Sequence, residues 1–161
     1  YAAIKEGLIR DEYDKTFYLF AGKIALKNHE PEQAKQYLQE AIALDPEYME
    51  AILVLMSIYS KQESYDEIIS LYEHISSQDF DWTALYPFVA EAYDKEEEFK
   101  KAYELYQAAY LDFKEDPTFL EKYCYFLLED GKQEQAKEIA AQLVALDPTE
   151  QQYIELLERF E

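Results

Sequence analysis

The stretch AIALDP (Ala41–Pro46) ends on Ala-Leu-Asp-Pro, and these four residues recur in LVALDP (Leu143–Pro148). The two copies lie 102 residues apart, which is three times 34 residues. In each copy the proline disfavours helical geometry at the preceding residue, so Asp45 and Asp147 are expected just beyond a helix end. The spacing therefore predicts blocks of 34 residues, with ALDP closing the second helix of a block.

Blocks of this length begin at Lys15, Met49, Thr83 and Pro117 without any insertion. Columns are numbered here by their place in a block. Column 4 then holds Tyr18, Ile52, Tyr86 and Leu120, and column 11 holds Ala25, Tyr59, Tyr93 and Leu127. Columns 4, 7, 8 and 11 follow the spacing of one helix face, and columns 20, 24 and 27 repeat it after a short break. Each block is therefore predicted to be helix, turn, helix, with antiparallel neighbours.

These columns carry a resemblance to the tetratricopeptide repeat (TPR) family, whose pattern is an aromatic, Leu-Gly, Tyr, Ala, an aromatic and Pro. Block one matches it with Tyr18, Ala21-Gly22, Ala34, Ala41 and Pro46. Block three matches it with Tyr86, Val89-Ala90, Tyr93, Ala102, Tyr106 and Ala109. Blocks two and four depart from it, since Ile68 and Ala140 stand where Ala and an aromatic are usual. The resemblance implies an all-α, right-handed superhelical solenoid of antiparallel helix pairs, in which the first helices line a concave groove.

The same lattice predicts the organisation of the whole chain. Residues 15–48, 49–82, 83–116 and 117–150 are expected to form TPR-like repeats 1 to 4. Residues 1–14 are expected to be the tail of a preceding repeat, because Ile4 and Gly7 occupy columns 24 and 27. Residues 151–161 are expected to be the first helix of a following repeat or a capping helix, because Ile154 and Leu157 occupy columns 4 and 7. Since the chain opens at Tyr1 without a Met, we expect a segment of a longer array.

Two prolines sharpen the expected helix ends. Pro87 is tolerated only in the first turn of a helix, so the first helix of repeat 3 is expected to start near Thr83, with Asp81 or Thr83 as its cap. Pro117 stands three residues later than the lattice position of a closing proline, which favours a longer second helix in repeat 3.

The charge of the chain excludes some partners. Asp and Glu number 35 against 15 Lys and Arg, a formal charge of −20. Such a surface repels nucleic acids and anionic membrane leaflets, so we expect neither as a partner. Solubility is the simpler interpretation of the acidity. The single cysteine cannot form an internal disulfide, and no apolar run approaches the roughly 20 residues that span a bilayer, so a cytoplasmic location is expected.

No pattern in the sequence indicates catalysis. The three glycines are scattered, and His29 and His74 lie in different blocks without the spacing of a zinc site. Cys124 falls in column 8, where a packed core thiol is the simpler interpretation. We therefore expect no enzyme, no cofactor and no metal.

A groove on the first helices is the expected partner site. The residues on the stripe beside the packing face are Leu19, Lys23, Leu26, Lys27, Leu53, Ser57, Lys61, Glu91, Lys95 and Tyr125. Column 13 repeats a lysine (Lys27, Lys61, Lys95), which predicts either a site for an acidic or carboxylate-ended peptide or simple stabilisation at helix C-termini. Columns 5 and 9 lack the Lys and Asn of the chaperone-binding clamp known in some TPR proteins. The mixture indicates an amphipathic or extended segment as the ligand.

The predicted function is a non-catalytic scaffold or adaptor that binds a peptide or protein segment in the groove. One alternative is self-association, in which exposed end helices pack against another copy to form a homo-oligomer. The other is a regulatory appendage of a larger protein whose activity lies outside this segment.

Overall fold

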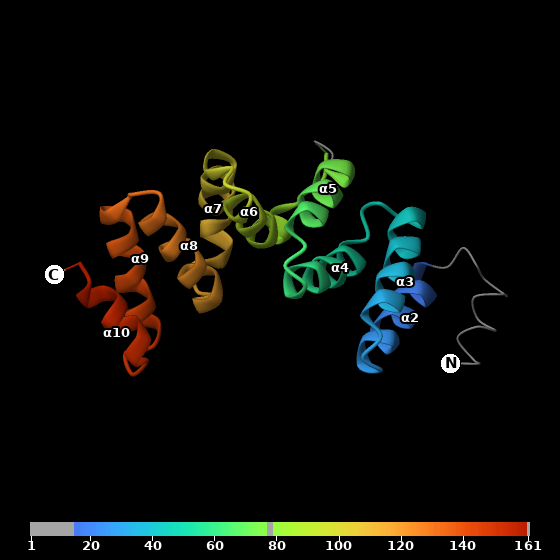
Figure 1. The fold of residues 1–161 in the computed structure, drawn as a ribbon, viewed down its shortest axis with the longest axis horizontal. Helices are drawn as coiled ribbons and strands as arrows, with labels where there is room; N and C mark the ends of the chain where they lie inside the picture. Colours follow the sequence, from blue (N-terminus) through green and yellow to red (C-terminus); the bar gives the residue numbers. More distant parts are fainter. Residues whose placement is uncertain (1–14, 77–78, 161) are drawn as a thin grey trace. The chain divides into compact units, whose positions relative to one another are not determined.

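The computed structural model describes residues 15–76 and 79–160, and every regular element in these ranges is helical. The elements are α2 (Lys15–Lys27), α3 (Pro31–Leu44), α4 (Met49–Lys61), α5 (Tyr65–Ile75), the 3₁₀ turn η1 (Thr83–Leu85), α6 (Tyr86–Lys95), α7 (Phe99–Phe113), α8 (Pro117–Glu129), α9 (Gln133–Leu146) and α10 (Gln151–Glu158) (Figure 1). The predicted all-α class is confirmed. The expected tail over residues 1–14, with Ile4 and Gly7, lies outside the described residues.

The chain divides into two compact units, residues 1–80 and 81–161. In the first unit α2 packs on α3, α3 on α4, and α4 on α5. In the second unit α6 packs on α7, α7 on α8, α8 on α9, and α9 on α10. Each unit is therefore a series of helical hairpins, and Figure 1 follows the helices of each in chain order.

The first helices α2, α4, α6 and α8 end in four equivalent turns, 34 residues apart. The residues at the centre of these turns have positive φ: His29 (61°), Glu63 (54°), Glu97 (60°) and Gly131 (74°). The next N–H donates to the carbonyl five residues back, with N···O distances of 2.9, 2.9, 2.8 and 2.8 Å, and in each case that carbonyl belongs to column 11. This is the Schellman arrangement, in which glycine is the favoured central residue. Only the fourth turn has one.

An aspartate closes each turn between one block and the next. Asp45 and Asp147 have extended geometry (φ −144° and −138°) directly after α3 and α9, as the following prolines predict. Each accepts a hydrogen bond from the backbone N–H two residues later, at 3.0 Å. Asp81 and Asp116 do the same at 3.0 and 2.9 Å, although they stand at later columns than Asp45 and Asp147. The ALDP sequence is absent from the two middle turns, but the hydrogen bond from a backbone N–H to the aspartate carboxylate is present in all four.

The helices of a hairpin approach each other closely at positions with small side chains. In the first hairpin a Cβ added to Gly22 would lie 2.9 Å from Cγ of Leu38. In the last, Sγ of Cys124 donates to the carbonyl of Ala136 at 3.3 Å. Cys124 is fully buried, which confirms its interpretation as a core thiol, and burial raises its pKa to about 11.

The start of the second unit agrees with the expected cap and refines the helix start. Asp81 Oδ1 accepts hydrogen bonds from the backbone N–H and the hydroxyl of Thr83. The segment from Thr83 is a 3₁₀ turn, and the α-helix itself begins at Tyr86, so that Pro87 lies in its first turn. With 15 residues, α7 is longer than α3, α5 and α9, as the late proline predicts.

Candidate functional site

The structure places the predicted stripe residues in different environments. Leu19 is 2% exposed and belongs to the core of the first unit, so its side chain offers no surface to a partner. The half-buried members are Lys23, Leu26, Leu53, Ser57, Glu91 and Tyr125. Lys23 forms an ion pair with Glu50 of the neighbouring helix, and Ser57 donates to the carbonyl of Val54 at 2.7 Å. In the first unit these polar groups are thus engaged within the unit itself.

The three lysines of column 13 are exposed, each in the last turn of its helix. Lys27 ends α2, Lys61 ends α4 and Lys95 ends α6. The carbonyl end of a helix carries partial negative charge and stabilises a cation there. Each of these lysines is also exposed, and both interpretations made from the sequence stay predictions.

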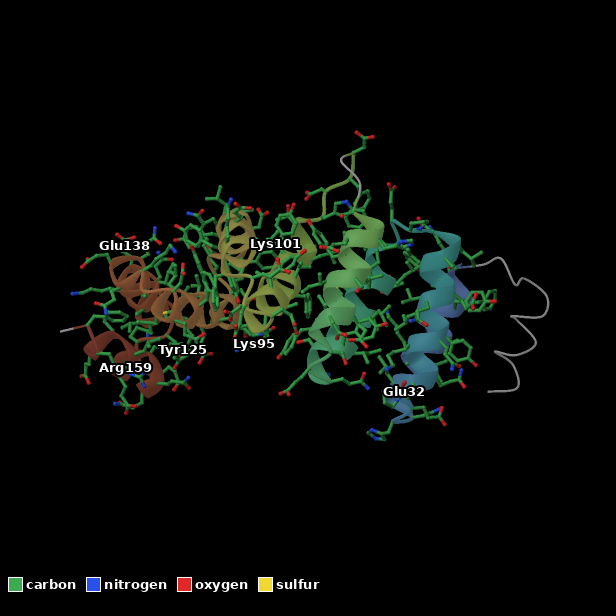
Figure 2. All side chains as sticks on the ribbon, turned by 45° about the horizontal axis from the view of Figure 1, so that its top comes forward. Glu32, Lys95, Lys101, Tyr125, Glu138 and Arg159 are labelled. Atoms are coloured by element: carbon green, nitrogen blue, oxygen red, sulfur yellow. The ribbon has the colours of Figure 1, made fainter. Side chains whose placement is uncertain are left out.

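In the second unit, three predicted residues line one hollow on the face of the first helices. We call it the first-helix pocket; its lining residues are Glu91, Asp94, Lys95, Tyr106, Lys122, Tyr125, Phe126 and Glu129. Its volume is about 250 Å³. Figure 2 labels two of the lining residues, Lys95 on α6 and Tyr125 on α8. The pocket combines aromatic rings with charges of both signs.

The charges in the pocket are not all balanced. Lys122 Nζ lies 2.5 Å from Oε2 of Glu91, which neutralises that carboxylate across α6 and α8. Oδ1 of Asp94 is buried and has no hydrogen-bond partner among the described residues. Burial raises the pKa of Asp94, Lys95 opposes the rise, and Glu129 and Glu91 add to it. The pocket thus holds one carboxylate that lacks a donor.

The hydroxyl of Tyr106 reports the same negative environment. Burial is the main cause that raises its pKa, and Asp94, Glu91 and Glu129 raise it further. Its ring lies in an aromatic cluster, with centroids 5.1 Å from those of both Tyr123 and Phe126. One side of the pocket is therefore formed by closely packed aromatic rings.

The residues predicted from the sequence do not include the other five lining residues, which are Asp94, Tyr106, Lys122, Phe126 and Glu129. Tyr106 belongs to a second helix, and the stripe considered only first helices. Lys122 and Phe126 occupy columns 6 and 10, beside the stripe. The sequence signal that could have found Lys122 is its spacing from Glu91: they lie 31 residues apart, so they face each other on successive first helices.

Within residues 15–76 and 79–160, no group of three or more His, Cys, Asp or Glu side chains is placed to hold a metal ion. Over the same part of the chain, no helix has the length and apolar character needed to cross a membrane.

Comparison with protein families identifies the class. A tetratricopeptide repeat model matches residues 25–91, and a model for YpiA-like C-terminal tetratricopeptide repeats matches residues 85–150. Together with the helical hairpins and their 34-residue turns, these matches show that the chain belongs to the tetratricopeptide repeat family. Proteins of this family are generally non-catalytic, and the chain is in general terms a protein-interaction scaffold.

The chain also resembles particular proteins. It is 38% identical over 157 residues to the TPR repeat-containing protein YpiA of Bacillus subtilis (strain 168), covering 98% of this chain and 37% of that protein. The chain thus spans little more than a third of the length of this relative.

Among solved structures, YrrB, a TPR protein with an unusual peptide-binding site, matches 98% of this chain and 81% of its own with a TM-score of 0.81 at 18% identity. MamA from Desulfovibrio magneticus matches 92% of this chain and 84% of its own with a TM-score of 0.75 at 16% identity. At these identities the likeness establishes the fold alone.

Proposed function

We propose that the chain is an adaptor that binds a peptide or protein segment in the first-helix pocket of its second unit. The observation that carries the proposal is the gathering of Glu91, Lys95 and Tyr125 around Asp94, whose Oδ1 lacks a donor. A buried acceptor without a partner costs on the order of 1 to 3 kcal/mol, and a ligand N–H would remove that cost.

The pocket chemistry describes the ligand segment. An N–H donor would bond Asp94, a carbonyl or carboxylate would bond Lys95, and an apolar group would pack on the ring of Tyr125. Tyrosine is favourable at such sites because its ring buries apolar area while its hydroxyl stays hydrated. The peptide-binding site of YrrB, a structural neighbour, supports a peptide as the ligand class.

Selection from a random peptide library against the whole chain tests this proposal. Peptides recovered with the wild type are expected to lose at least about tenfold in affinity when Lys95→Glu or Tyr125→Ala is introduced, because each residue contacts the ligand directly. Lys100→Glu is the matched control, since Lys100 is exposed on α7 and does not line the pocket. Peptides that bind all three variants as tightly as the wild type would refute the pocket as the site.

Self-association is a second candidate, favoured by an exposed apolar face on α2. Phe17, Phe20 and Ile24 are 39%, 56% and 38% exposed. Their counterparts 102 residues later include Phe119 and Phe126, which are buried where α8 packs on α7. A face of this type is built to receive a helix, and a second copy would supply one. Sedimentation velocity over a range of concentrations would show a dimer that Phe20→Lys abolishes, whereas a monomer at all concentrations would exclude it.

A regulatory role within a larger protein also stays a proposal, and so does the cytoplasmic location predicted from the single cysteine. The lengths compared above are in keeping with a larger protein, since the relative YpiA is much longer than this chain. Measuring the activity of the full-length protein with and without residues 15–150 would test it.

A further inference from the structure

Each unit carries a surface hollow between its second helices, and the two hollows are built from equivalent positions. In the first unit, on α3, α4 and α5, the shared positions are Gln39, Ile42, Leu55, Tyr59, Leu71 and His74. In the second unit, on α7, α8 and α9, they are Gln107, Tyr110, Tyr123, Leu127, Ile139 and Gln142. Each residue of the second set stands 68 residues, two blocks, after its counterpart in the first. We call these hollows the second-helix notches; neither shares a lining residue with the first-helix pocket.

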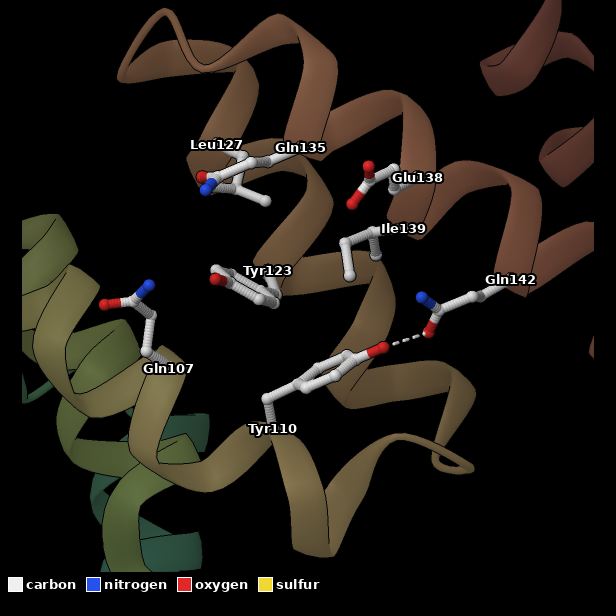
Figure 3. A pocket seen from close by; sticks show the side chains of 8 residues that line it. All are labelled: Gln107, Tyr110, Tyr123, Leu127, Gln135, Glu138, Ile139 and Gln142. Carbon is white, nitrogen blue, oxygen red and sulfur yellow. Dashed lines mark hydrogen bonds between the residues drawn. The ribbon is translucent and has the colours of Figure 1, made fainter.

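The notch of the second unit has an apolar base and a polar rim on which Glu138 is the one acidic residue (Figure 3). Leu127 and Ile139 are buried at the base. On the rim, the hydroxyl of Tyr110 donates to Oε1 of Gln142 at 2.7 Å, a bond drawn in Figure 3. Gln107 is also tied in place, since its Nε2 donates to the hydroxyl of Tyr103 at 2.8 Å. These bonds fix the positions of Gln107, Tyr110 and Gln142 on the rim.

The notch of the first unit repeats this construction with other residues. Nε2 of Gln39 donates to the hydroxyl of Tyr59 at 3.2 Å, so a glutamine and a tyrosine pair here too, although at other positions than Tyr110 and Gln142. Ile42 and Leu71 provide apolar walls. The two notches therefore share six lining positions and a lining of apolar and polar side chains, although their sequences differ at five of these positions.

Both notches are almost free of charge in a strongly charged chain. Nine residues line the first and eight line the second, and Glu138 is the single one with a formal charge when His is neutral. Because 31% of the chain is charged, about five charged residues would be expected among them. Burying a charge against such a lining leaves it without a partner, which is costly. The lining thus matches an uncharged group and opposes an anion in both notches, and it opposes a cation in the notch of the first unit, which has no carboxylate.

The size of the notches limits the occupant further. Their volumes are about 280 and 210 Å³. Pockets for small-molecule ligands usually measure roughly 300 to 1,000 Å³. Each notch therefore suits a single side chain of a protein partner better than a whole ligand or cofactor.

We propose that each second-helix notch binds one uncharged aromatic or aliphatic side chain presented by a segment of a partner protein. The side chain buries its apolar surface on the base of the notch, and the glutamine amides on the rim bond the partner's backbone. The chain thereby has two equivalent anchoring sites, one in each unit, in addition to the first-helix pocket.

Methyl NMR on the full chain, labelled at Ile and Leu, tests the proposal with blocked single amino acids as probes. N-acetyl-phenylalanine amide and N-acetyl-leucine amide are expected to shift the methyl signals of Leu127 and Ile139, and of Ile42 and Leu71, in a saturable manner. N-acetyl-glutamate amide is expected to cause no saturable shift at either notch, and N-acetyl-lysine amide none at the notch of the first unit. Equal affinity for a charged probe at a notch where it is expected not to bind, or no saturation by either apolar probe, would overturn the proposal.

Two pairs of variants locate the binding. Gln142→Glu keeps the acceptor for Tyr110 but adds a charge to the rim, so it should raise Kd for the phenylalanine probe at least about threefold in the second unit alone. Gln133→Glu is its control, on the same helix α9 but outside the notch. In the first unit His74→Glu should weaken binding, whereas His74→Gln, which copies the residue of the second notch, should not. Equal effects within either pair would overturn the proposal.

Discussion

Two of the four Schellman turns lie in the second unit, and they predict opposite effects on its stability. Replacing the central glycine of one turn should destabilise the unit, and introducing a glycine at the centre of the other should stabilise it. Gly131 adopts φ 74°, and a Cβ added there meets no atom within 4 Å, so Gly131→Ala adds backbone strain without any clash. Glu97 holds the equivalent geometry, φ 60°, with a side chain that is exposed. Glu97→Gly therefore removes the same strain and loses little else.

The magnitude follows from two opposing effects. Left-handed geometry costs a residue with a Cβ about 1 to 2 kcal/mol. Glycine in turn loses about 0.5 to 1 kcal/mol more conformational entropy on folding than alanine. We expect Gly131→Ala to lower the free energy of unfolding by about 0.5 to 1 kcal/mol, and Glu97→Gly to raise it by a similar amount.

Urea unfolding followed by tryptophan fluorescence is the suitable assay. Trp82 is the only tryptophan of the sequence, and it is buried in the second unit, so its emission reports the unit in which both changes lie. Gly131→Asn is a useful intermediate, because asparagine tolerates left-handed geometry better than alanine. If Glu97→Gly lowers the free energy of unfolding, or Gly131→Ala leaves it unchanged, strain in these turns does not govern stability.

Three further changes test other contacts. Gly22→Ala should destabilise the first unit by about 1 to 3 kcal/mol, because the new methyl overlaps the buried Leu38. Circular dichroism during urea unfolding measures this loss, and a variant as stable as the wild type would contradict the overlap. Asp116→Ala should lower the melting temperature through a loss of about 1 kcal/mol in stability, since the Asp116 carboxylate accepts hydrogen bonds from backbone N–H groups in the first turn of α8. Asp116→Asn should keep most of the wild-type stability and serves as the control, because asparagine also caps helices. Asp94→Asn should stabilise the chain at pH 7. The raised pKa of Asp94 means that the fold favours its protonated form, so stability is lost as pH rises through that pKa. The advantage of the variant should shrink toward zero below about pH 4, and an advantage that is the same at both pH values would contradict this assignment.

The regular part of the fold could be predicted from the sequence because it depends on periodic side-chain size. The elements α4, η1 and α8 begin at Met49, Thr83 and Pro117, where the blocks were cut. The left-handed residues could not be predicted in three of the four turns, since His29, Glu63 and Glu97 carry a Cβ and give no glycine signal. Whether each block is a repeat with those limits stays a proposal.

The candidate site could be predicted only in part, because pockets are lined from several helices. Two residues of the predicted stripe, Glu91 and Lys95, line the first-helix pocket from α6, whereas Leu19 turned out to be core. Whether these residues bind a partner stays a prediction. At column 5 a leucine satisfies the pattern of either a groove or a core, and only packing decides between them. The second-helix notches were missed altogether, since their lining comes from three helices at columns that look like ordinary core and surface in a single block.

The single thiol makes local opening of the second unit measurable. Cys124 is fully buried, its Sγ bonds the carbonyl of Ala136 on the facing helix, and burial holds its pKa near 11. A thiol reagent can reach it only when α8 and α9 part, and the sequence has no other cysteine to obscure the signal. The rate at which the reagent labels Cys124 therefore measures how often the hairpin of α8 and α9 opens. A ligand that binds in the first-helix pocket or in the second-helix notch and holds α8 against its neighbours will lower this labelling rate. The ligand itself needs no label.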